Sequence, residues 1–125
     1  MTRKTVLAIG IDPVFVDYTA LPQFTPEMFR GYIDAQIERV RSLGYEVTGC
    51  LIDLGETAEA VTAQALKSRD FDCVLIGAGS RLPPERLLLF EKVINLIHRL
   101  APAACICFNT TPADTPEAVR RWVES

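Results

Sequence analysis

Short apolar segments alternate four times with longer amphipathic segments along this chain. The short segments are continuous apolar runs, a pattern typical of parallel strands that are buried on both faces. They cover residues 5–9, 46–52, 73–76 and 104–108. The alternation predicts βαβ units, in which helices cover both faces of a parallel sheet.

The helix starts carry their own sequence signals. Thr25-Pro26-Glu27 and Thr115-Pro116-Glu117 each place an N-cap hydroxyl before a proline and an acid, and Pro84-Glu85 opens a third helix in a similar way. Gly44 is expected to end the first helix. We therefore expect helices over residues 26–43, 57–69, 84–100 and 116–124.

Right-handed crossovers between the four strands most simply give the strand order 2-1-3-4. The predicted fold is a three-layer Rossmann-like or flavodoxin-like α/β domain. The chain has 125 residues, of which 49% are hydrophobic, so residues 1–125 are expected to form one domain with a substantial core.

Charge and hydropathy narrow the classes of partner. With 13 basic and 16 acidic residues the net charge is −3, which gives no attraction for nucleic acid or an anionic membrane. The longest uncharged stretch, residues 100–113, contains two prolines and is short of the ~20 apolar residues that a membrane span needs. The apolar run near the start stops at Asp12-Pro13, too early for a secretory signal. We expect a cytoplasmic protein whose four cysteines are buried, inert thiols.

Ligands of such sheets bind outside the carboxyl ends of the strands, at the point where the connections diverge. For this strand order the point lies between the first and third strands. The segment Gly77-Ala78-Gly79-Ser80-Arg81 follows the third strand, so its backbone amides and Arg81 can hold an anion at the start of the next helix. The alternative interpretation is a tight turn in which the glycines supply a positive φ and Arg81 is solvated.

Two carboxylates and an asparagine lie at the ends of the other strands. Asp12 and Asp53 can bind a divalent cation, orient a ribose or act as an acid and base pair. They can equally serve as turn-forming or capping groups. Asn109 follows the fourth strand and is expected to contact the polar part of a ligand.

The connection of residues 13–24 is longer than the two to six residues that usually join a strand to a helix. It is expected either to close over the crevice as a lid, bringing Tyr18 near a ligand, or to plug the top of the sheet.

The helix over residues 84–100 has an apolar arc wider than one sheet face usually needs. The arc fits a helix packed between the sheet and its neighbours, or a homodimer contact through Leu87, Ile94 and Leu88. His98, the only histidine, is expected near the helix end, where it interacts with the helix dipole and takes no part in catalysis.

At the level of the fold the chain resembles flavodoxin-like domains and response-regulator receiver domains. The residues that carry their functions are missing, because Gly77 follows the third strand where a receiver has its aspartate and Gly10-Ile11-Asp12 replaces a flavodoxin phosphate loop. The segments 51–61 and 107–110 are similar to those of small microbial Rossmann-like proteins of no assigned activity.

These observations lead to one expected function and two alternatives. We expect a domain that binds a small anionic or nucleotide-like metabolite at the crevice through Gly77, Gly79, Ser80 and Arg81, with Asp12, Asp53, Asn109 and Tyr18 contacting the rest of the ligand. No motif identifies a cofactor. The first alternative is an enzyme that uses Asp12 and Asp53 as a metal-holding or acid/base pair. The second is a non-catalytic module that dimerises through the helix over residues 84–100.

Overall fold

The computed structural model of the chain describes residues 3–125 and has one parallel sheet of four strands. The strands are β1 (Thr5–Ile11), β2 (Glu46–Ile52), β3 (Cys73–Ile76) and β4 (Cys105–Phe108). Their order is β2-β1-β3-β4, and the two long strands pair residue for residue from Thr5 with Glu46 to Ile11 with Ile52. The predicted parallel sheet and its order are confirmed.

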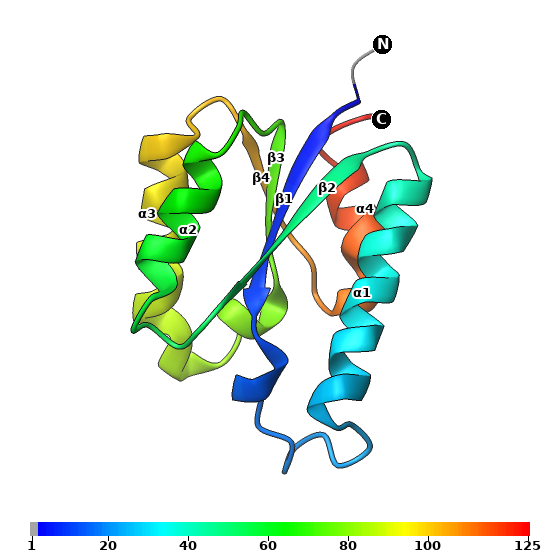
Figure 1. Cartoon of the computed structure of the whole chain (residues 1–125), viewed down its shortest axis with the longest axis vertical. Helices are drawn as coiled ribbons and strands as arrows, with labels where there is room; N and C mark the ends of the chain where they lie inside the picture. Colours follow the sequence, from blue (N-terminus) through cyan, green and yellow to red (C-terminus); the bar gives the residue numbers. More distant parts are fainter. Residues whose placement is uncertain (1–2) are drawn as a thin grey trace.

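Helices cover both faces of the sheet, as predicted for a three-layer α/β domain (Figure 1). One face carries α1 (Pro26–Ser42) and α4 (Thr115–Arg120), and the other carries α2 (Ala58–Lys67) and α3 (Leu87–Leu100). Within residues 3–125, no helix has the length and hydropathy that crossing a membrane requires.

Several helix boundaries differ from the sequence prediction. The second helix covers Ala58–Lys67 and not residues 57–69. The predicted N-cap role of Thr115 is wrong, because α4 begins at Thr115 with Asp114 as its N-cap and the Thr115 hydroxyl donates to the Pro112 carbonyl. A 3₁₀ turn occupies Pro84–Arg86, so α3 begins only at Leu87. The last helix ends at Arg120, before the predicted residue 124, and the Trp122 amide donates to the Val119 carbonyl in a tighter i to i−3 bond. The predicted end of α1 is confirmed, since Gly44 follows it with a φ of +101°.

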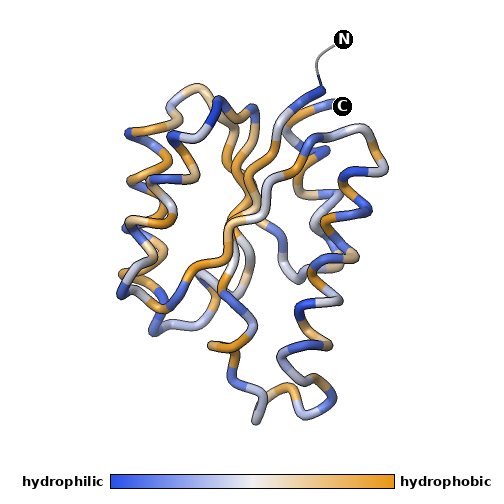
Figure 2. Tube along the Cα trace, in the orientation of Figure 1, coloured by the Kyte–Doolittle hydropathy of each residue, from blue (hydrophilic) through white to orange (hydrophobic). Residues whose placement is uncertain are grey.

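Two apolar cores flank the sheet, and hydrophobic residues concentrate along the strands (Figure 2). On the α2 and α3 side, alternate residues of β1 such as Leu7 and Ile9 are buried. The expectation that every strand is buried on both faces holds for β3 but not for β2 and β4, because these form the edges of the sheet. For the same reason Cys105 is exposed, whereas the other three cysteines are buried.

Candidate functional site

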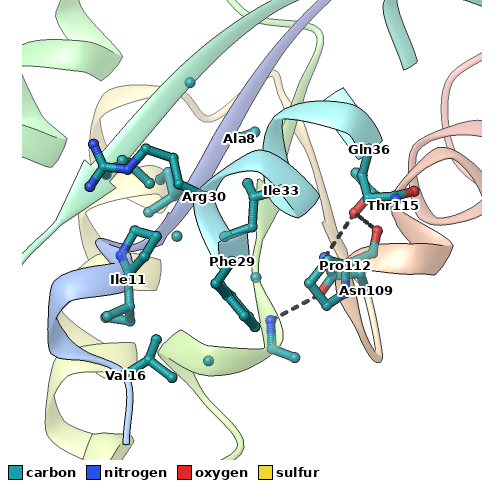
Figure 3. A pocket seen from close by; sticks show the side chains of 18 of the residues that line it. Ala8, Ile11, Val16, Phe29, Arg30, Ile33, Gln36, Asn109, Pro112 and Thr115 are labelled. Carbon is teal, nitrogen blue, oxygen red and sulfur yellow. Dashed lines mark hydrogen bonds between the residues drawn. The ribbon is translucent and has the colours of Figure 1, made fainter. Parts of the chain in front are cut away.

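A cavity of about 570 Å³ lies between α1 and the carboxyl-terminal half of the sheet. Its lining is mostly apolar, and Figure 3 shows side chains from α1, β1 and the strand-end loops around it. The main contributors are Ala8, Gly10, Gly49, Leu51 and Leu75 from the strands, Phe29, Arg30, Ile33 and Asp34 from α1, Gly77, Ala78, Gly79 and Asn109 from the segments after β3 and β4, and Thr115 from the start of α4. This volume is in the range of small-molecule sites.

Small residues on one face of two neighbouring strands leave the floor of the cavity open. Ala8 pairs with Gly49 across β1 and β2, and Gly10 follows two residues after Ala8 on the same face of β1. A Cβ atom added at Gly10 would meet no atom within 4 Å, and one added at Gly49 would only touch Ile37 at 4.0 Å. Neither glycine has a positive φ, so the backbone conformation does not require glycine at either position.

The long connection after β1 closes one end of the cavity. Val16, Asp17 and Leu21 line the cavity from this segment. Aromatic contacts hold the segment on α1, because Phe24 meets the Phe29 ring at a centroid distance of 5.2 Å. The segment therefore borders the crevice and packs on α1. Closure of residues 13–24 over a ligand stays a prediction.

Tyr18 lies next to residues that line the cavity, but Tyr18 is not itself one of the described residues in the lining. Its hydroxyl donates to the Pro13 carbonyl at 2.6 Å, and its ring meets that of Phe29 edge to face. Burial raises the pKa of Tyr18, and the negative charge of Glu27 adds to this effect. In this geometry the hydroxyl stabilises the loop.

Asn109 joins the two loops that follow β3 and β4. The residue is 4% exposed. The Oδ1 atom accepts a hydrogen bond from the Ala78 amide at 2.8 Å, and Nδ2 donates to Thr115 Oγ1 at 3.0 Å (Figure 3). Asn109 therefore fixes the relative positions of the loops that form one wall of the cavity.

The glycine-containing loop after β3 uses most of its amides within the protein. The Gly77 and Ser80 amides donate to backbone carbonyls, and the Ala78 amide donates to Asn109. Gly77 and Gly79 line the cavity. The alternative interpretation, in which these glycines supply a positive φ, is wrong, because neither has one. Gly77 instead allows the loop to lie close to β1, since an added Cβ would be 3.4 Å from the Ile9 carbonyl oxygen.

Arg81 lies on the side of the sheet opposite the cavity. Its guanidinium is 5.0 Å from the centre of the Phe108 ring, which packs against the α2 and α3 core, and it donates to the Asn109 carbonyl. Ser80 is fully buried, and its hydroxyl has no hydrogen-bond partner in the described structure. The structure thus separates Arg81 from Gly77 and Gly79, with which the sequence grouped it, and an anion contact by Arg81 stays a prediction.

Asp12 and Asp53 both make local capping interactions. Asp12 Oδ1 accepts from the Val14 amide and forms an ion pair with Arg30 at 2.8 Å. The Asp53 carboxylate accepts from the Gly55 amide and from the Thr57 amide and hydroxyl. These hydrogen bonds, that from the Thr57 hydroxyl above all, hold the pKa of Asp53 below its usual value. The capping interpretation of both residues agrees with this geometry.

Possible metal ligands and cysteine thiols are the remaining reactive groups of residues 3–125. No group of three or more histidine, cysteine, aspartate and glutamate side chains in this range is placed to hold a metal ion. The Sγ atoms of Cys73 and Cys107 lie 3.4 Å apart in the core under α4. The hydrogen bond between these thiols and their burial raise the pKa of Cys73, so its thiol is protonated at neutral pH.

Sequence reasoning missed the floor of the cavity and the α1 residues that cover it. The spacing Ala8-x-Gly10 and the glycine at 49 carried the signal, because small residues at alternate positions of strands empty one face of a sheet. Arg30 and Asp34 gave no comparable signal, since charged residues one turn apart on an amphipathic helix are common on solvated surfaces.

No protein-family model matches the chain, and none of the curated proteins matches it significantly.

Proposed function

We propose that this chain is a small-ligand-binding domain that holds an organic anion with a largely apolar body in the cavity under α1. The observation that carries the proposal is the open floor at Gly10. Glycine inside a strand costs about 0.5–1 kcal/mol relative to alanine, and nothing in the local backbone or packing accounts for it here. Space for a ligand explains why the position has no side chain.

The lining of the cavity supports the chemical class of the ligand. Apolar residues such as Ile33 and Leu75 favour a flat or aliphatic body. Arg30 supplies a positive charge at the edge, and buried Asn109 holds the opposite wall in place. A nucleotide-like ligand, which the glycines of residues 77–79 predict, is the more polar member of the same class.

A probe titration with a cavity-filling variant tests this function. The probe is 8-anilinonaphthalene-1-sulfonate, an aromatic monoanion whose fluorescence reports binding. Displacement of the bound probe by AMP, which is not fluorescent, tests nucleotide-like ligands. Gly10→Leu should weaken binding of the sulfonate by about tenfold or more, a loss of at least ~1.4 kcal/mol, because the new side chain fills the floor of the cavity.

The control adds the same side chain outside the cavity. Gly31→Leu places leucine on α1 where an added Cβ also meets nothing, and Gly31 does not line the cavity. This variant should bind the sulfonate like the wild type. Equal affinities in the wild type and Gly10→Leu, or no binding to the wild type, would contradict the proposal.

The enzyme alternative has less support in the structure. Asp12 and Asp53 are the residues it uses, and both carboxylates are occupied by capping hydrogen bonds or an ion pair. The second alternative, association of two copies, has a specific observation in its favour: Leu87 and Leu88 at the start of α3 are 61% and 63% exposed.

The surface beside Leu88 suits contact with a second copy. Glu59, Glu91, Lys92 and Arg99 border a shallow groove next to it, so charges of both signs can pair across a twofold axis. Sedimentation velocity between micromolar and millimolar concentrations should show a reversible dimer that Leu88→Glu dissociates. A wild-type monomer at every concentration would contradict this assignment of α3.

A further inference from the structure

One ion pair connects a residue of the cavity lining on α1 with the residue that follows β1. Arg30 projects from α1, and Asp12 directly follows the last residue of β1. Arg30 Nη2 lies 2.8 Å from Asp12 Oδ1, and the Arg30 side chain extends from α1 towards the end of β1 (Figure 3). Arg30 itself lines the cavity. Its guanidinium is therefore within reach of a ligand that enters between α1 and the sheet.

The ion pair is of a kind that a ligand can replace. The side chains of Arg30 and Asp12 are 47% and 29% exposed, and ion pairs in contact with water contribute little to stability. Asp12 also keeps a partner when Arg30 leaves, because the same Oδ1 atom accepts from the Val14 amide at 3.1 Å. Breaking the pair thus leaves no buried group without a hydrogen bond.

The charges around the cavity disfavour a ligand with several negative charges. The lining contains the carboxylates of Asp17, Asp34 and Glu85, and the second guanidinium in it belongs to Arg86. A polyphosphate would meet repulsion from these acids. A single planar carboxylate matches the fork of a guanidinium and would take the place of the Asp12 carboxylate on Arg30.

We propose that the ligand of this cavity is a monocarboxylate with an apolar body, and that Arg30 recognises it by exchanging Asp12 for the carboxylate of the ligand. The proposal rests on the proposed function and names its ligand class. Arg30 is then a specificity-determining residue, and Asp12 is an internal competitor that keeps Arg30 positioned when the cavity is empty.

Three probes that share one ring system test the exchange by calorimetric titration. They are 2-naphthoate, the neutral 2-naphthamide and the cationic 2-naphthylmethylamine. The wild type should bind naphthoate most tightly. Arg30→Gln should lower the naphthoate affinity about tenfold, because it removes the charged hydrogen bonds, and should leave the naphthamide affinity unchanged. Asp12→Asn should raise the naphthoate affinity by roughly fivefold, because it removes the competing charge while asparagine still caps the turn.

A matched pair of controls carries the same charge changes far from the cavity. Arg69 and Glu46 form an exposed ion pair at 3.2 Å beside the start of β2, and neither residue lines the cavity. Arg69→Gln and Glu46→Gln should change the affinity for naphthoate by less than about twofold, since exposed charges at this distance are screened.

The outcomes separate the two proposals. If none of the three probes binds, both proposals fall. If all three bind equally in every variant, the cavity is a binding site and the role of Arg30 falls. Tighter binding of the amine than of naphthoate would show that the acidic residues of the lining decide the specificity, and would also overturn the exchange.

Discussion

Replacing Asn109 by leucine should lower the free energy of unfolding by about 2–4 kcal/mol, because two buried hydrogen bonds are lost together. Leucine has the same number of side-chain heavy atoms as asparagine and puts methyl groups in place of the amide oxygen and nitrogen. The Ala78 amide loses its acceptor at 2.8 Å, and the Thr115 hydroxyl loses its donor at 3.0 Å. With Asn109 only 4% exposed, water cannot replace these partners without opening the loops. Urea unfolding followed by circular dichroism measures the change.

A surface asparagine provides the control for this substitution. Asn95 on α3 is exposed, and its Nδ2 atom donates to a carbonyl in the same helix. Asn95→Leu should change the free energy of unfolding by less than about 0.5 kcal/mol, as surface substitutions usually do. A loss below about 1 kcal/mol for Asn109→Leu would mean that the two strand-end loops hold their positions without this bridge.

The arrangement of the sheet was predictable because its signals are local and agree with one another. Four apolar runs gave four strands, and right-handed crossovers allow few orders for them. A hydroxyl cap marked the start of α1, where Thr25 Oγ1 does accept from the Met28 amide at 3.2 Å, whereas Thr115 is the first residue of α4 and not its cap. Each of these features depends on residues that are close in sequence.

The residues of the candidate site were harder to predict because several polar groups had two possible partners. Asp53 meets Thr57 four residues on and is used locally as a cap. Arg81 stacks on Phe108, which faces the α2 and α3 core, so its side chain lies across the sheet from the cavity. Residue type and position in a loop do not determine on which face of the sheet a long side chain lies.

The cavity itself depends on strand register. Ala8 and Gly49 are 41 positions apart in the sequence, and only the pairing of β1 with β2 places them side by side. The covering residue Arg30 comes from a third element, α1. A cavity formed by three separate segments leaves no continuous pattern in the sequence. The small residues on each strand are its one local signal.

Neighbouring residues of β1 should respond in opposite ways to alanine, and this is the second large effect that we expect. Ile9 is 1% exposed and faces the filled core under α2 and α3. Ile9→Ala should lower the free energy of unfolding by about 3 kcal/mol, because it removes apolar contacts and leaves a cavity that the packed sheet cannot close. Gly10→Ala should raise it by up to about 1 kcal/mol, because alanine restricts the unfolded chain and its Cβ meets no atom within 4 Å.

Because the two substitutions affect adjacent residues of one strand, differences in backbone hydrogen bonding or strand position cannot produce opposite signs. The substitutions differ in that Ile9→Ala shortens a side chain on the filled face, whereas Gly10→Ala adds a methyl group on the open face and restricts the unfolded chain. Urea unfolding of both variants at the same pH gives the comparison. If Gly10→Ala were as destabilising as Ile9→Ala, α1 would have to lie against the sheet at Gly10, and the cavity on which the proposed function depends would be closed in solution.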